Sequence, residues 1–218
     1  MTIASRLLRA TSAASGVEFA LVLPLFLLLL FGIIDGGRFM YEYNEAEKAT
    51  QVGARVAVVT NVLSTGLRDE NYAGQVVGGT AIAAGGRIPA GALGSLKCTD
   101  TGCTCETSPC PSDLGTFDSD TFNNVLVARM QQMYPAIRPE NVIVRYSGSG
   151  FGFAGTVSGG GGGGGGGATP QMEISPLVTV TLTGVQFRPI TTMLIATMTM
   201  PSFSTTLTAE DASGAYYN

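Results

Sequence analysis

Histidine and tryptophan are absent from this chain of 218 residues. Because histidine is the side chain whose ordinary pKa lies closest to neutral pH, its absence removes the usual general base of an enzyme. It also removes the commonest ligand of zinc and copper. Composition therefore excludes triads of the serine–histidine kind and most metallohydrolase sites. We expect a protein that is not an enzyme and that holds neither a cofactor nor a metal ion.

Charged residues are also scarce. They make up 13% of the chain, about half the share that is usual for a soluble domain. From Phe39 onward there are 9 basic and 14 acidic residues, a net charge of −5. This part therefore lacks the basic surface by which proteins bind nucleic acid. Carboxylates are present, but no two of them stand in a context that predicts a glycosidase pair.

The chain contains one long run without charge, from Phe19 to Ile34, and Glu18 is the only charged residue between Ala10 and Ile34. At roughly 1.5 Å per helical residue, the run and the weakly polar residues directly before it can cross a hydrocarbon core of about 30 Å. This predicts a transmembrane helix. A carboxylate costs about 2.5–3.5 kcal/mol at the centre of such a helix and less near an end. Glu18 therefore either meets a partner or lies in water at the membrane surface.

The flanks of this run predict its orientation. Arg6 and Arg9 precede it, so the positive-inside rule keeps the N-terminus in the cytoplasm and exports everything after the span. The run is close in length to the apolar region of a secretory signal peptide, but no small-x-small cleavage site follows it. The small residues Ser12, Ala13 and Ala14 precede it instead. We therefore expect a retained single-pass anchor.

Three segments in and after this run resemble one protein family. They are Gly-Val-Glu-Phe-Ala-Leu-Val-Leu-Pro-Leu from Gly16, Phe-Gly-Ile-Ile-Asp-Gly-Gly-Arg from Phe31 and Ala-Thr-Gln-Val-Gly-Ala-Arg from Ala49. Over residues 13–60 the chain resembles the N-terminal region of TadE-like proteins, the minor pilins or pseudopilins of tight-adherence (Tad, Flp-type) pilus systems. A weaker resemblance covers residues 177–208, which are similar to the β-rich C-terminal part of such proteins.

This resemblance implies a location and a set of partners. The chain would lie in the bacterial cytoplasmic (inner) membrane, with its N-terminus in the cytoplasm and its C-terminal domain in the periplasm or in a pilus. Its partners would be the membrane itself, other pilins or pseudopilins and the Tad assembly machinery. A prepilin peptidase would be a further partner if the N-terminal leader is cut.

The resemblance also implies candidate site residues. In this family the peptidase commonly cuts after a glycine, and the characteristic glutamate is then fifth in the mature chain. Glu18 would be that glutamate, but the position five before it is Ala13 and the nearby glycine is Gly16. Either cleavage follows Ala13 and leaves Ala14 as the new N-terminus, or the chain is not cut. The implied role of Glu18 is to pair with the N-terminal amine of a neighbouring subunit.

The four cysteines, Cys98, Cys103, Cys105 and Cys110, form a C-x4-C-x-C-x4-C array. In an exported domain, an even number of clustered cysteines indicates disulfides. A bridge between Cys103 and Cys105 would close a very small ring, which leaves two pairings. Either Cys98 pairs with Cys103 and Cys105 with Cys110, or Cys98 pairs with Cys105 and Cys103 with Cys110. A four-thiolate metal site is the alternative, but it lacks the usual C-x2-C spacing.

Hydrophobic periodicity predicts the remaining elements. The helix should continue through residues 35–60, with carboxylates such as Glu42 facing water. Apolar residues at helical spacing predict a second helix over 120–133, capped by Asp118 or Ser119. Also expected are strands over 142–146, 177–187 and 203–208, a short helix over 190–198, an irregular segment over 61–118 with a cysteine loop at 98–110, and a glycine-rich tether over 158–167.

Together these elements predict an α+β, pilin-like fold in which a long N-terminal helix, membrane-spanning in its first half, packs on a small antiparallel sheet. The expected parts are a cytoplasmic N-terminus or leader (1–18), the transmembrane helix (19–34), its continuation (35–60) and the exported head (61–218). We expect a minor pilin or pseudopilin of Tad-type pilus assembly. A single-pass membrane-anchored periplasmic binding or adhesion domain is the alternative.

Overall fold

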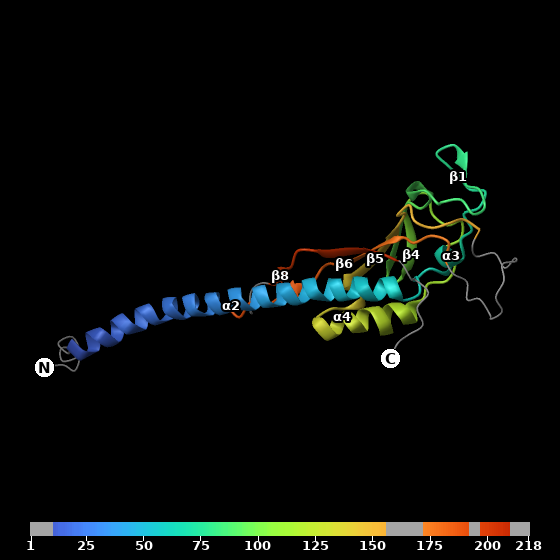
Figure 1. Ribbon diagram of the computed structural model, residues 1–218. Helices are drawn as coiled ribbons and strands as arrows, with labels where there is room; N and C mark the ends of the chain where they lie inside the picture. Colours follow the sequence, from blue (N-terminus) through green and yellow to red (C-terminus); the bar gives the residue numbers. More distant parts are fainter. Residues whose placement is uncertain (1–10, 156–171, 192–196, 210–218) are drawn as a thin grey trace. The chain divides into compact units, whose positions relative to one another are not determined.

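A computed structural model describes residues 11–155, 172–191 and 197–209 of the chain, with side chains from Gly16 onward (Figure 1). The glycine-rich tether expected over 158–167 lies outside the described residues.

The chain divides into two compact units. The helix unit consists of residues 1–43 and 186–199, and the head unit consists of residues 44–185 and 200–218. Helix α2 contributes to both units, since it begins at Thr11 and ends at Val59.

Helix α2 is continuous and passes through Pro24 without ending. It is long and apolar enough to cross a membrane, and none of its most apolar window is buried. Leu21, Leu25 and Leu29 are 75%, 72% and 63% exposed. A soluble protein rarely leaves such an apolar surface uncovered, which agrees with a membrane helix.

The head unit contains a five-stranded antiparallel sheet with the strand order β4-β3-β5-β6-β9. The strands are β3 (Ser95–Thr99), β4 (Gly102–Thr107), β5 (Val142–Ser147), β6 (Leu177–Leu182) and β9 (Phe203–Thr208). The strands expected over 142–146 and 203–208 are therefore present. The long helix and these antiparallel strands confirm the α+β class.

One face of this sheet forms the core of the head unit. In β5, the alternate residues Val142, Val144 and Tyr146 are buried. The register continues this row across the sheet, because Leu96 lies opposite Tyr146 and Tyr146 lies opposite Val178. The period of two along each strand thus places one apolar row inward.

The second part of α2 covers the core with small side chains. Ala46 and Ala49 have no exposed surface. Gly53 makes the closest approach: a Cβ atom built there would lie 2.7 Å from Sδ of Met130 and 3.2 Å from Cγ1 of Val180. Only a residue without a side chain fits this position without movement of its neighbours.

A second helical segment lies beside this part of α2 (Figure 1). It is a π-helix, η2 (Thr121–Val127), continued by α4 (Ala128–Met133), at the place predicted from the sequence. Oδ1 of Asp118 accepts a hydrogen bond from the backbone N–H of Thr121 at 2.9 Å, as a capping side chain does. The buried side chains of this segment are those of Thr121, Phe122, Leu126, Val127 and Met130.

The segment over 61–118 is more regular than expected, and the prediction of irregular structure was wrong. It contains α3 (Thr65–Asp69), a hairpin of β1 (Val76–Val77) and β2 (Thr80–Ala81), the 3-10 turn η1 (Ala90–Ala92) and the strands β3 and β4. Most of the cysteine loop expected over 98–110 is the β3–β4 hairpin, and Cys110 follows the end of β4. These elements are too short and too rich in glycine and threonine to show a hydrophobic period of their own.

The strand expected over 177–187 is interrupted. β6 ends at Leu182, and Gly184 has a φ of 70°, a left-handed conformation that glycine adopts easily. At the break, the backbone N–H of Thr183 donates to the carbonyl of Asn141 at 2.8 Å, and Nδ2 of Asn141 donates back to the carbonyl of Thr183 at 3.0 Å. The regular alternation of valine and threonine concealed this turn.

The chain after the break enters the helix unit. There β7 (Gln186–Phe187) pairs antiparallel with β8 (Met198–Thr199). The short helix expected over 190–198 falls mainly on residues 192–196, outside the described part, while Met198 begins β8. We call residues 186–191 and 197–199 the β7–β8 arm.

We expect Gly53→Val to lower the free energy of unfolding of the head unit by roughly 1–3 kcal/mol, the usual cost of overpacking a filled core. The added methyl groups would have to displace Val180 as well as the more flexible Met130. Thermal unfolding of the full chain in detergent, followed by circular dichroism, measures this change.

Gln51→Val is the matched control, because Gln51 is exposed on the same helix. Its effect should stay within about 0.5 kcal/mol. Equal losses of stability in the two variants would contradict the close packing at Gly53.

Candidate functional site

Glu18 lies in α2 just before the charge-free run, and its side chain is exposed. Among the described residues, its carboxylate has no hydrogen bond or ion pair. Its neighbours Val17 and Phe19 are 61% and 64% exposed. The carboxylate therefore stands on an open apolar surface, and the described chain offers it no partner.

The candidate processing residues lie on the same helix. Ala13 and Ala14 are in the first turns of α2, and Gly16 follows with no atom within 4 Å of a Cβ atom built there. Cleavage at these positions stays a prediction, as does the pairing role of Glu18.

Asp35 is a site residue that the sequence analysis missed. It directly follows the charge-free run and is only 6% exposed. The backbone N–H of Ile190 donates to its Oδ1 at 2.7 Å, and the N–H and hydroxyl of Thr191 donate to its Oδ2 at 2.8 and 2.7 Å. Both oxygens are thus satisfied, as a buried carboxylate requires. In the sequence, only its position directly after the charge-free run set Asp35 apart from the other carboxylates.

The next turn of α2 extends this contact with the β7–β8 arm. Arg38 lies 3.6 Å from the carboxylate of Asp35 and 3.5 Å from that of Glu42. Its guanidinium stands over the ring of Phe187 at 5.5 Å, and Phe39 meets the same ring edge-on at 5.4 Å. The expectation that Glu42 faces water was wrong, because its side chain is 23% exposed and pairs with Arg38 one turn away.

The cysteines form two pairs in and beside the β3–β4 hairpin. Cys98 and Cys103 are opposite residues of the ladder, and their Sγ atoms lie 1.97 Å apart. The Sγ atoms of Cys105 and Cys110 lie 2.10 Å apart. The register favours this pairing, because Cys105 lies opposite Leu96 and not opposite Cys98. The structure thus has the first of the two pairings that the sequence left open.

An ion pair connects the same hairpin to the rest of the sheet. Nε of Arg145 on β5 lies 2.8 Å from Oε2 of Glu106 on β4. This hydrogen bond lowers the pKa of the Glu106 carboxyl, although partial burial acts in the opposite direction. The pair therefore stays charged at neutral pH. Because both side chains are partly exposed, its contribution to stability is at most about 1 kcal/mol.

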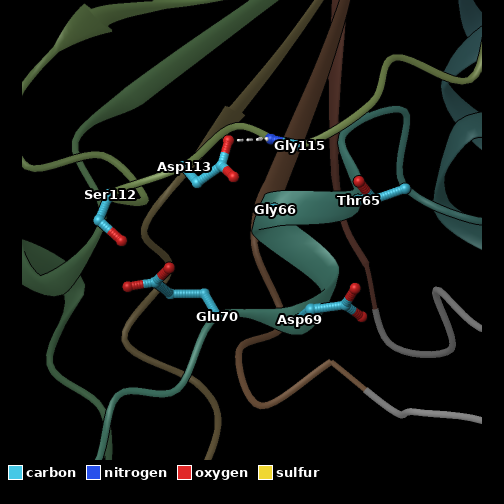
Figure 2. Close-up of a pocket in the computed structure, with 7 residues that line it drawn as sticks. All are labelled: Thr65, Gly66, Asp69, Glu70, Ser112, Asp113 and Gly115. Atoms are coloured by element: carbon cyan, nitrogen blue, oxygen red, sulfur yellow. Dashed lines mark hydrogen bonds between the residues drawn. The ribbon is translucent and has the colours of Figure 1, made fainter.

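A pocket of about 280 Å³ lies in the head unit, where α3 faces the segment after the cysteine hairpin (Figure 2). It is lined by Thr65, Gly66, Asp69 and Glu70 on one side and by Ser112, Asp113 and Gly115 on the other. The two backbones approach closely, since a Cβ atom at Gly66 would collide with the backbone of Asp113.

The three carboxylates of this pocket already have partners. Asp69 pairs with Arg68 at 2.7 Å, and Glu70 accepts a hydrogen bond from Gln75 at 2.7 Å. Asp113 accepts a hydrogen bond from the backbone N–H of Gly115 at 2.8 Å (Figure 2). Burial raises the pKa of Glu70, against the hydrogen bond from Gln75. Within the described part of the chain, no group of ligating side chains could hold a metal ion. The pocket is thus a gap between two closely packed backbone segments, α3 and residues 112–115.

Comparison with protein-family models matches residues 13–55 to the family described as TadE-like protein. The match includes Glu18, the charge-free run, Asp35 and Gly53, and it ends within α2. Neither a curated protein nor a solved structure matches the chain. The TadE-like resemblance is thereby confirmed over residues 13–55, a segment of α2, which is the candidate membrane helix.

We expect Cys98→Ser to free the thiol of Cys103, because these two residues are bridged. The full chain is denatured without reductant and alkylated, and fragment mass spectrometry locates the label. A label on Cys105 instead would show the crossed pairing. Cys110→Ser is the reciprocal variant and should free Cys105.

The unsubstituted chain is the control and should take up no label. Alkylation of all four cysteines, or zinc bound in stoichiometric amount, would contradict the disulfides and favour a thiolate metal site.

Proposed function

We propose that this protein is a non-enzymatic minor pilin or pseudopilin that takes part in Tad-type pilus assembly through α2. The observation that carries the proposal is that the TadE-like segment, residues 13–55, includes the apolar run over 19–34, and that none of the most apolar window of α2 is buried. A helix that is apolar on all sides is stable in lipid or among other apolar helices. The same surface can thus serve first as an anchor and then as a contact between subunits.

Glu18 supplies the specific contact in this proposal. An unpaired charge in apolar surroundings is costly, whereas an opposite charge at short range is weakly screened there. The N-terminal amine of a neighbouring subunit is such a charge. If a prepilin peptidase cuts after Ala13, that amine belongs to Ala14.

Two glycines support helix packing along the same surface. Gly32 and Gly36 are four positions apart, and a Cβ atom built at either meets no atom within 4 Å. Small residues at this spacing let the backbones of membrane helices approach closely. We assign this open space to contacts with neighbouring pilin helices.

The proposed location is the bacterial inner membrane, with a single span and the head in the periplasm. Arg6 and Arg9 support the orientation through the positive-inside rule. The paired cysteines of the head support an oxidising compartment. The proposed partners are other pilins or pseudopilins, the Tad assembly machinery and, where the leader is cut, a prepilin peptidase.

One observation favours the alternative of a membrane-anchored binding or adhesion domain. Phe151 and Phe153 of the head unit are 55% and 57% exposed, and the guanidinium of Arg87 stands over the ring of Phe151 at 5.4 Å. Exposed aromatic side chains beside a cation are common in binding surfaces. A domain of this kind would act without other pilins, so dependence on them separates the two functions.

We expect alkaline phosphatase fused after Asn218 to be active in cells, because this enzyme requires export and the chain should export everything after the span. A β-galactosidase fusion at the same position should be inactive for the same reason. The reversed pattern would contradict the proposed orientation.

We expect Glu18→Gln to leave membrane insertion and head folding intact but to lower incorporation into the pilus or its assembly complex. The loss should be roughly tenfold or more, because leaving one charge of a buried pair unmatched costs about 3–5 kcal/mol. Glu18→Asp should fall between, since the charge is kept on a shorter side chain. Co-purification with other pilins and counts of pili measure the effect.

Glu47→Gln is the matched control, since Glu47 is exposed in the later part of the same helix. It should leave assembly unchanged. Normal piliation by Glu18→Gln would show that Glu18 lies at the membrane surface without a pairing role.

A further inference from the structure

The β7–β8 arm is attached to α2 at a defined level along the helix. Its turn residues Ile190 and Thr191 donate three hydrogen bonds to the carboxylate of Asp35. Phe187, in the strand before the turn, packs against Phe39 one turn further along α2. All of these residues belong to the helix unit. The arm is therefore fixed to the helix by polar and aromatic contacts.

This level is the end of the apolar run. Residues 19–34 would extend about 24 Å as a helix, most of the thickness of a hydrocarbon core. Asp35 is the first charged residue after them, so in an inserted helix it lies near the boundary between acyl chains and head groups. The turn that it holds must lie near the same boundary.

The exposed residues of the arm have the composition of an interfacial element. Ile190 is 43% exposed and Met198 is 54% exposed. No charged residue occurs between Pro189 and Ala209. Arg188 is exposed directly before this stretch, where a guanidinium can bind the phosphate of a lipid head group. Apolar side chains with a flanking cation are typical of segments that lie on a membrane.

Asp35 also removes the obstacle to placing a turn at this depth. Backbone N–H groups that leave water without a hydrogen-bond partner are costly, which keeps lipid-exposed irregular backbone out of the hydrocarbon region of a membrane. Here the N–H groups of both Ile190 and Thr191 are bound by Asp35. The turn can thus approach the lipid without leaving these donors unpaired.

From this geometry we propose that Ile190 and Met198 of the β7–β8 arm form a second membrane contact, in which both side chains lie among the lipids at the outer end of the span. A lipid surface is the occupant we assign because it surrounds this level of α2 whenever the helix is inserted, before any subunit has assembled. The contact fixes how deeply α2 sits and adds a second attachment beside the helix. It rests on membrane insertion of α2 and not on the pilus role.

The test uses the full chain in vesicles of phosphatidylethanolamine and phosphatidylglycerol. Ile190→Cys and Met198→Cys are each labelled with a nitrobenzoxadiazole probe without reductant, so that the paired native cysteines stay unlabelled. Lipids that carry a nitroxide quencher close to the head group are then added to the membrane. Both labels should be quenched roughly twofold or more strongly than a label in water, because interfacial segments lie about 5–10 Å into this boundary.

Two further labels serve as references for membrane depth and for water. Leu28→Cys, 60% exposed in the apolar run, should be quenched by deep nitroxides, and Val76→Cys, 67% exposed in the head unit, should report water. Asp35→Ala should lower quenching at position 190 while quenching at position 28 stays unchanged, since it releases the turn and not the span. If quenching is lost at position 190 but kept at position 28, the helix is still inserted, and the loss comes from release of the turn by the Asp35 variant.

Each other outcome overturns the proposal in a recognisable way. Labels at 190 and 198 that respond like the label at 76 would show that these two residues lie in water. Labels that are shielded from water but not quenched by lipid would show a protein partner, either a second copy or another subunit. Absence of deep quenching at position 28 would refute membrane anchoring itself, and the arm contact with it.

Discussion

An apolar helix surface that the described part of the chain leaves uncovered is the constraint on which the rest of the structure depends. Large leucine, isoleucine and phenylalanine side chains project from all sides of the first part of α2. The free energy gained by removing such a surface from water must come from lipid or from other helices. None of the most apolar window of α2 is buried against the described residues. The first part of α2 therefore has the surface of a helix that lies in a membrane, and the proposed function depends on that environment.

The same helix has a second kind of surface in the head unit. Ala46, Ala49, Gly53 and Ala57 follow one another at steps of three and four residues, and the three alanines are at most 4% exposed. Small residues allow the sheet and α4 to approach the helix closely, and Gly53 marks the tightest point. One continuous element thus changes from large exposed side chains to small buried ones, which fits a change of environment from lipid to protein core.

The long helix could be predicted because its signals are local: absence of charge over 19–34 and apolar periodicity after it. The helix after Asp118 was equally visible through its cap and its apolar stripe. The β3–β4 hairpin was missed because Leu96 and Cys98 gain their burial from distant strands, not from their own sequence neighbours. The arm was missed for the same reason, since 155 positions separate Asp35 from Ile190. Pairings at that distance leave no periodic trace in a single sequence.

The two carboxylates at the ends of the apolar run meet the same electrostatic problem in different ways. Asp35 is buried, and residues far along the same chain give both of its oxygens hydrogen-bond donors. Glu18 is exposed, and the described chain gives it none. A carboxylate whose needs are met internally stabilises the fold, whereas one left open can be satisfied only by water or by another molecule. If α2 enters an apolar bundle, water is lost as a partner, and Glu18 then makes entry depend on an opposite charge at the right depth. In the proposed assembly, the difference between these two residues would let one helix both bind its own β7–β8 arm through Asp35 and select its neighbours through Glu18.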